Sequence, residues 1–283
     1  MIRWATRLVL GALLLFLVHL LVFRYFPVPV TPLMVLRALQ GEGLDRQWVS
    51  LDEMSVHLPR AVIASEDNRF CEHGGVDWSE FKTVMEEYRD DGRLRGASTV
   101  SMQTVKNLYF WPGRSVIRKG LELAMVHVLE AAWSKDRIME VYLNIAEMGP
   151  GIYGVEAAAR RYWGVSALAV SANQSAALVS ILPAPRKRNP TRVNRITADR
   201  IVRIKRSVVQ LGPMLECVSV PKSRRSLRKQ GDDLGIPVDV DTSQTVPVHF
   251  QLKDTKGKNK SAPNEPRRSK GKKVQPKRRR GAR

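Results

Sequence analysis

The chain has 283 residues, a formal net charge of +20 and 43% hydrophobic residues, which suits one sizeable globular domain with additional segments. Its two cysteines, Cys71 and Cys217, exclude a disulfide-rich framework and show no metal-ligand spacing. A single bridge between them would need an oxidising compartment, and nothing in their spacing demands one. We therefore expect both cysteines to be free thiols.

The first predicted element is a membrane-spanning helix. Residues 8–26 are mostly apolar, with His19 as a polar interruption, and they reach the length of about 20 residues that a bilayer requires. Arg3 and Arg7 precede the apolar run, so the positive-inside rule places residues 1–7 in the cytoplasm and the rest of the chain outside. A cleaved signal peptide is the alternative, but the following sequence FRYFPVPV offers no small-residue cleavage site.

The segment 33–215 is predicted to be mainly α-helical. Helix-capping signals stand before four apolar stretches, at Ser50–Glu53, Asp77–Glu80, Ser134–Asp136 and Ser171–Gln174. Apolar residues recur at helical spacing at Ile117, Leu121, Ala124, Val128 and Ala132. Alternating patterns typical of strands are scarce before Val218, so we expect one helical domain. Residues 216–252 are an extension whose structure the sequence does not predict.

The C-terminal segment 253–283 carries 14 Lys or Arg residues against two acids, a net charge of +12. Because it has almost no apolar residues, it cannot bury enough surface to offset its conformational entropy, and we expect it to be disordered. Such a tail binds polyanions such as anionic lipid or cell-wall polymer through charge alone. A solvated tail without a dedicated partner is the alternative, and no specific nucleic acid is expected.

The stretch ASEDNRFCEHGGVD gathers four carboxylates, an arginine and a histidine. Asp77 is explained as a helix cap, and Glu72 is expected to be exposed. Glu66 falls in the last turn of a short helix with Pro59 in its first turn. There, the negative end of the helix dipole and partial burial would raise its pKa, as a general base needs. On spacing alone, a surface ion pair between Glu66 and Arg69 stays open.

A second polar cluster lies between residues 93 and 137, where eight Lys or Arg residues accompany three acids. Hydroxyl, amide and amine side chains follow one another there, at Ser98, Thr99, Gln103, Lys106 and Asn107. Arg118 and Lys119 precede Glu122 at i,i+4 and i,i+3 spacing. An ordinary helix-surface ion pair stays open, although the Arg-before-Glu order is the less stabilising one. The cluster favours an anionic, phosphate-bearing ligand, and the absence of GxxxxGK[ST] excludes a nucleotide P-loop.

Five stretches in order resemble the motifs of the peptidoglycan glycosyltransferase family: EDNRFCEHGGVD, GASTVSMQTVKN, RKGLE, RIMEVYLNIAEMGPGIYGVEAAARRYWG and QSAALVSILPAPRKRNP. They cover about residues 45–195. No SxxK with a KTG partner is present, so the chain resembles the monofunctional members rather than those with a transpeptidase domain. The resemblance implies a mainly α, lysozyme-like domain behind a single N-terminal transmembrane helix.

The resemblance implies an inverting glycosyltransferase of bacterial cell wall biogenesis at the cell inner membrane. It would polymerise lipid II into β-1,4-linked glycan strands outside that membrane and release undecaprenyl pyrophosphate. In the family, the residue matching Glu66 is the general base. The glutamate matching Glu122 assists the leaving pyrophosphate or a bound cation. The positions that hold pyrophosphate match Lys106, Arg118 and Lys119.

The remaining family positions are expected to bind substrate or shape the site. Those lining the substrate match Ser98, Thr99, Gln103 and Asn107, with Asp67 and Arg69 beside the base. The second motif usually carries two adjacent glutamines, and here the first is Met102. His73 is expected to shape its loop, Tyr142 and Asn144 to orient neighbours, and Gly149, Gly151 and Gly154 to form turns. The resemblance implies that no cofactor is required and that no residues act as metal ligands, although a divalent cation, Mg or Mn, is compatible with it. It also implies cell-wall synthesis proteins as partners.

Two other functions stay open on the residues alone. A lytic enzyme of the same broad fold would cleave glycan strands, but it would need a general acid aimed at a glycosidic oxygen and no basic cluster. A membrane-tethered polyanion-binding protein would depend on the tail, residues 253–283.

Overall fold

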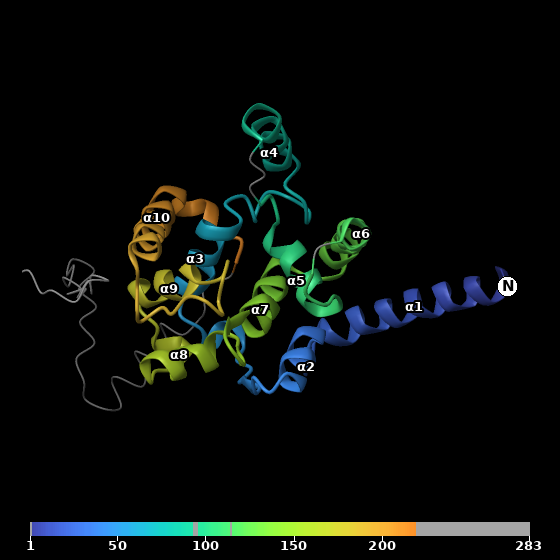
Figure 1. Ribbon diagram of the computed structural model, residues 1–283, viewed down its shortest axis with the longest axis horizontal. Helices are drawn as coiled ribbons and strands as arrows, with labels where there is room; N and C mark the ends of the chain where they lie inside the picture. Colours follow the sequence, from blue (N-terminus) through green and yellow to red (C-terminus); the bar gives the residue numbers. More distant parts are fainter. Residues whose placement is uncertain (1, 93–95, 114, 219–283) are drawn as a thin grey trace, which may run out of the picture. The chain divides into compact units, whose positions relative to one another are not determined.

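The computed structural model describes residues 2–92, 96–113 and 115–218 (Figure 1). The predicted extension beyond residue 218 and the basic tail 253–283 lie outside the described residues. The α-helices are α1 (Ile2–Phe23), α2 (Pro32–Leu39), α3 (His57–Glu66), α4 (Trp78–Asp91), α5 (Val100–Tyr109), α6 (Val116–Ala132), α7 (Lys135–Ile145), α8 (Val155–Trp163), α9 (Ala172–Ser180) and α10 (Arg195–Leu211). The short elements are β1 (Asp45–Arg46), β2 (Glu147–Gly149), β3 (Ile152–Tyr153) and the 3-10 turns η1 (Leu51–Glu53), η2 (Ala167–Ala169) and η3 (Gly212–Leu215). The prediction of a mainly helical domain is confirmed.

Helix α1 is, within the described residues, the one helix long and apolar enough to cross a membrane. It begins earlier than the predicted span and ends at Phe23. A turn follows to Phe26, and Pro27, which has no backbone N–H, cannot extend the helix. Its last carbonyls are satisfied by the domain: Trp133 Nε1 donates to Leu20 O at 2.8 Å, and Arg137 Nε donates to Phe23 O at 3.0 Å. The C-terminal turns of α1 are thus attached to the helical domain.

The predicted caps form, and they fix where each helix starts. Asp77 accepts from the backbone of Glu80 at the start of α4, as expected. Ser134 caps α7, and Ser171 with Gln174 forms a complete capping box on α9. The box at Ser50–Glu53 opens the short turn η1 rather than an α-helix.

Helices α3, α9 and α10 pack against one another as a three-helix group (Figure 1). Leu58, Val62 and Ile63 of α3 are fully buried, and each such side chain stabilises the fold by about 1.5–3 kcal/mol. Small residues on α9, among them Ser175 and Ala176, allow the close approach. Helix α5 packs on both α6 and α7, which builds the second half of the body. The carboxyl end of α3 therefore sits on a rigid support.

A small sheet joins the start of the domain to the segment after α7. Strand β1 pairs parallel with β3, and β2 pairs antiparallel with β3. Gly151 has a φ of +69°, and a Cβ there would lie 2.0 Å from Glu42 O; at Gly154 a Cβ would lie 2.7 Å from Asn144 O. Both positions need glycine for backbone reasons, which confirms that these glycines are structural.

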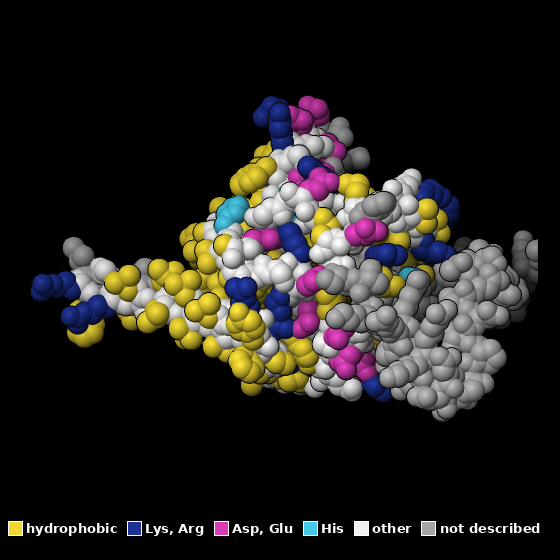
Figure 2. All heavy atoms as spheres, turned by 180° about the vertical axis from the view of Figure 1, so that it is seen from behind, with side chains coloured by type: hydrophobic (Ala, Val, Ile, Leu, Met, Phe, Trp, Pro, Cys, Tyr) yellow, Lys and Arg dark blue, Asp and Glu magenta, His cyan; other side chains and the backbone are white. Residues whose placement is uncertain are grey.

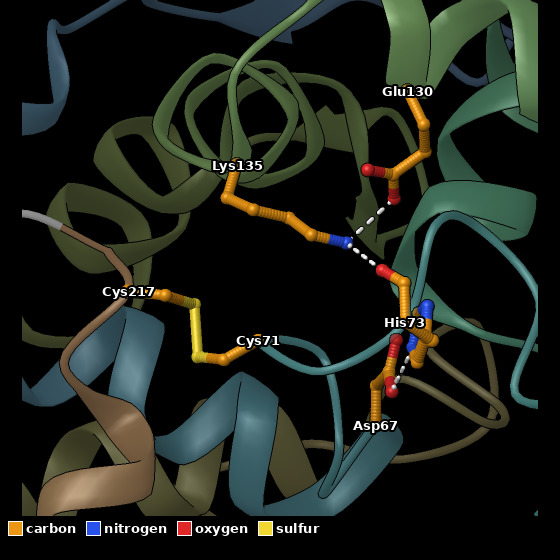
Figure 3. The surroundings of a disulfide bond; sticks show 6 residues. All are labelled: Asp67, Cys71, His73, Glu130, Lys135 and Cys217. Carbon is orange, nitrogen blue, oxygen red and sulfur yellow. Dashed lines mark hydrogen bonds and ion pairs between the residues drawn. A yellow bond between two sulfur atoms is a disulfide. The ribbon is translucent and has the colours of Figure 1, made fainter.

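The expectation of free thiols is wrong. Cys71, in the loop after α3, forms a disulfide with Cys217, which follows η3 (Figure 3). The two residues are 146 apart in sequence, and their Cα atoms are 5.5 Å apart. Local spacing could not predict the pair, because only the packing of α10 on α3 returns the chain to this loop.

The apolar repeat that predicted α6 faces outward. Ile117 is 79% exposed and Leu121 50% exposed, whereas the buried face of α6 consists of Glu122, Val126 and Leu129. The helix was therefore predicted correctly, but its apolar stripe is not part of the core.

Candidate active site

Glu66 is the last residue of α3, as predicted, and its side chain is 13% exposed. Three donors hold its carboxylate. Oε1 accepts from Arg200 at 2.7 Å and from Ser65 Oγ at 3.0 Å, and Oε2 accepts from Gln103 Nε2 at 3.2 Å. The carboxylate is thus fixed in direction while Oε2 keeps room for another partner.

Arg69 does not pair with Glu66, so the surface ion pair left open by their spacing does not form. Instead, its guanidinium contacts Glu72 at 2.6 Å and Asp77 at 3.3 Å. Glu72 is exposed, as expected. Burial of Asp77 raises its pKa, whereas hydrogen bonds from Ser79 and the Glu80 backbone, together with the charge of Arg69, lower it. The net effect is a lowered pKa of Asp77.

The loop after α3 is fastened by Asp67 and His73 (Figure 3). Asp67 Oδ2 accepts from the backbone of Val100 at 2.9 Å, and Oδ1 contacts His73 Nε2 at 2.8 Å. His73 Nδ1 accepts from Gly75 N at 3.1 Å, so the ring proton sits on Nε2 and points to Asp67. Lys135 Nζ donates to His73 O at 2.7 Å. His73 therefore shapes the loop, as predicted, and Asp67 ties the loop to the start of α5.

Gln103 connects Glu66 to the core. Its amide nitrogen donates to Glu66, and its Oε1 accepts from the hydroxyl of Tyr142 at 2.9 Å. Burial raises the pKa of Tyr142 well above its ordinary value, so the hydroxyl stays a donor. The neighbouring Met102 is 2% exposed and packs in the core, so its position offers no polar group to the site.

The two hydroxyls of the second stretch have different partners. Thr99 is buried, caps α5 and donates to Gly75 O at 2.5 Å. Ser98 is half-buried, and its Oγ accepts from Lys119 Nζ at 3.1 Å. Ser98 thus joins the part of the site around Glu66 to the cations of α6.

Glu122 is 2% exposed and lies between two cations. Arg118 and Lys119 each approach its carboxylate at 3.4 Å, which forms the ion pairs their spacing allowed. Lys106 faces this group from α5. Desolvation, together with the cations of Arg118 and Lys119, lowers the pKa of Lys106, while the carboxylates of Glu122 and Glu66 oppose the shift. The cations and both glutamates are therefore electrostatically coupled.

Two cavities, each of about 310 Å³, flank the contact between Glu66 and Gln103. The "cationic cavity" contains four predicted site residues, Gln103, Lys106, Asn107 and Arg118. The "Glu66 cavity" contains five, Glu66, Asp67, Arg69, Ser98 and Thr99. Glu122 and Lys119 lie behind these linings, in contact with Arg118 and Ser98 respectively. The structure thus brings all the predicted site residues together.

Sequence reasoning missed Arg200 and Ser65, the two residues that hold Glu66 Oε1. One signal existed for Arg200: it lies three and four residues from the buried Thr197 and Ile204, so a charge sits on the inward face of α10. Within the described part of the chain, no group of three or more His, Cys, Asp or Glu residues could hold a metal ion.

The helical body thus holds two glutamates, Glu66 and Glu122, beside a cavity lined by cations, an arrangement suited to an enzyme with an anionic substrate. The family model described as Transglycosylase matches residues 34–209. The biosynthetic peptidoglycan transglycosylase of Rhodospirillum centenum is 48% identical over 217 residues, 75% of this chain and 94% of that protein. That of Caulobacter vibrioides is 46% identical over 204 residues, 71% of this chain and 89% of that protein. The chain belongs to the transglycosylase family, as a monofunctional glycosyltransferase of peptidoglycan biosynthesis, and the family expected from the five stretches is confirmed.

Proposed function

We propose that this enzyme polymerises lipid II into β-1,4-linked glycan strands and releases undecaprenyl pyrophosphate. The observation that carries the proposal is the anchored carboxylate of Glu66 next to a cavity lined by cations. Lys106 links the two, because its ammonium interacts with Glu66 and Glu122 and lies near Arg118. A donor whose reacting carbon bears a pyrophosphate needs a base and cations within one site.

In the proposed reaction Glu66 is the general base. Its Oε1 already accepts from two donors, so Oε2 takes the proton from the 4-hydroxyl of the acceptor N-acetylglucosamine. The acceptor oxygen forms a bond to C1 of the donor N-acetylmuramic acid. The bond from C1 to the pyrophosphate oxygen breaks, and its electron pair leaves with the pyrophosphate. Attack opposite the leaving group inverts C1 and gives the β linkage.

The leaving pyrophosphate needs charge neutralisation more than protonation, and we assign this to Lys106, Arg118 and Lys119. Glu122 holds Arg118 and Lys119 in place through its 3.4 Å contacts with both side chains. With two cations this close, its carboxylate is a poor ligand for a divalent ion held by the protein alone. We therefore propose that the enzyme needs no resident metal, and that any effect of Mg²⁺ or Mn²⁺ acts through the substrate pyrophosphate.

We propose that the enzyme is anchored in the cell inner membrane by α1, with the catalytic domain on the outer side. Figure 2 shows a hydrophobic surface along α1, with Lys and Arg side chains at its free end, the end that carries Arg3 and Arg7. The exposed apolar stripe of α6, which includes Val116 and Ile117, belongs to a helix in contact with α1 and would face the same membrane. A disulfide in the domain also suits an oxidising compartment.

Incubation of the full chain with purified lipid II in detergent tests the function. We expect long glycan strands, with the same product in the presence of EDTA. Breakdown of purified sacculi without polymerisation would instead support the lytic enzyme. Deletion of residues 253–283 should leave polymerisation largely intact, whereas loss of all activity would mean that the tail takes part in the reaction. We further propose that partners are other cell-wall synthesis proteins.

A further inference from the structure

We propose that Arg200 on α10 is a positioning residue for Glu66, acting from outside the five stretches that identify the family. It holds one oxygen of the carboxylate so that the other faces the acceptor. This inference rests on the proposed role of Glu66 as the base. Helical spacing places Arg200 on the inward face of α10, but only the fold shows that it meets Glu66.

The contacts of Arg200 are directed at the end of α3. Its terminal nitrogen donates to Glu66 Oε1 at 2.7 Å and to Ser65 Oγ at 2.8 Å. The side chain is 25% exposed, and its Nε is buried without a hydrogen-bond partner. Burying a guanidinium nitrogen in this way costs free energy. The charge-assisted bond to Glu66 is the interaction that offsets this cost.

The geometry gives the two carboxylate oxygens different tasks. Ser65 and Arg200 both bind Oε1, whereas Oε2 receives one longer bond from Gln103. A carboxylate held at one oxygen by a charged donor cannot rotate freely about its last bond. Without Arg200, the remaining neutral donors leave the direction of Oε2 poorly defined, and misplacement of a reacting group by about 1 Å can cost about 100-fold in rate.

Helix α10 is itself fixed relative to the base. It packs on α3 and α9, and the chain that leaves it through η3 is bonded by the disulfide from Cys217 to Cys71. Cys71 lies in the same loop as Asp67 and His73 (Figure 3). Both ends of the contact between Arg200 and Glu66 are therefore tied to one loop, which favours a fixed distance between them.

The test compares Arg200→Gln, Arg200→Ala and Arg200→Lys with Arg203→Gln and Arg206→Gln, matched controls on the exposed face of α10. Initial rates of lipid II polymerisation give kcat and KM, and thermal unfolding checks the fold. We expect kcat to fall about 10- to 100-fold in Arg200→Gln with KM changed by less than about threefold. Arg200→Lys should recover part of the rate, and the controls should match the wild type.

Guanidinium ion gives a second readout. Added at millimolar concentration, it should raise kcat of Arg200→Ala several-fold and leave Arg203→Gln unchanged, which a merely structural role would not produce. A near wild-type kcat in Arg200→Gln, or loss of rate without rescue by lysine or guanidinium, would overturn the positioning role while Glu66→Gln stays inactive. A wild-type enzyme that fails to polymerise lipid II would overturn the proposed function itself.

Discussion

The hydroxyl of Tyr142 donates a hydrogen bond to Oε1 of Gln103, and this contact decides which end of the amide faces Glu66. A carboxylate only accepts hydrogen bonds, so Glu66 needs the amide nitrogen of Gln103. Since burial keeps the Tyr142 hydroxyl protonated, the amide has one favourable orientation. A buried tyrosine thus orients a hydrogen-bond partner of Glu66 without contacting Glu66 itself.

Replacing this tyrosine tests the arrangement. Tyr142→Phe removes one hydrogen bond and frees the Gln103 amide, so we expect kcat to fall about fivefold, which corresponds to about 1 kcal/mol. Tyr162→Phe is the matched control, because the Tyr162 hydroxyl donates to Met148 O at 2.9 Å away from the base. Steady-state polymerisation rates measure both. Equal rates in the two variants would contradict the orienting role of Tyr142.

Glu66→Gln should abolish turnover but keep lipid II binding. The amide cannot accept the acceptor proton, and loss of a general base costs about 100- to 10,000-fold. Glu72→Gln, at an exposed position in the loop that follows α3, is the control and should keep its rate. Polymerisation and equilibrium binding are measured on the same preparations. A Glu66→Gln enzyme with a rate close to the wild type would remove Glu66 from the role of base.

Glu122→Gln should be severely impaired for a different reason. The substitution leaves Arg118 and Lys119 close together without the buried charge between them, so both cations move and the fold loses stability. We expect a lower kcat and a lower melting temperature, measured by polymerisation and by thermal unfolding. An unchanged melting temperature with a normal rate would show that Glu122 does not hold the cations.

The lowered pKa of Lys106 predicts a pH dependence. Lys106 is cationic below its pKa, so as the pH rises it loses its charge earlier than an ordinary lysine, and pyrophosphate binding weakens. In the same window the unfolded chain binds the proton more tightly, so this group's contribution to the free energy of unfolding rises with pH. Lys106→Arg should move the alkaline limb of the KM profile to higher pH, because arginine stays charged. If the alkaline limb of the KM profile does not move in Lys106→Arg, the titrating group is another residue.

The disulfide should stabilise the fold strongly because it closes a loop of 146 residues. On the loop-entropy estimate, replacing both cysteines by serine lowers the free energy of unfolding by about 3–5 kcal/mol. Denaturant unfolding of the double variant and of the wild type with and without reductant measures this. The reduced wild type should match the double variant. If reductant has no effect on the midpoint, the bridge does not form in the protein.

The residues near Glu66 illustrate how far sequence reasoning reached. The cap at Asp77 and the helix ending at Glu66 depend on neighbours within one or two turns, and these were predicted. The ion pair of Arg118 with Glu122, which their spacing left open, is present in the structure. Whether Glu66 pairs with Arg69 was left open, because both partners were plausible at that spacing. The stripe at Ile117 predicted a helix correctly but not its orientation, since periodicity locates a face and does not say what covers it.

The sequence by itself determined the helices, their starts and the residues that gather at the site, because capping and hydrophobic periodicity act over a few residues. The five stretches added the family. Only the tertiary structure decided the contacts between distant residues: Arg200 with Glu66 across 134 positions, and Cys71 with Cys217 across 146. The physical reason is that both pairs form only because α10 packs on α3. That packing is driven by burial of apolar faces, and because many sequences could supply such faces, the sequence does not specify which helices meet.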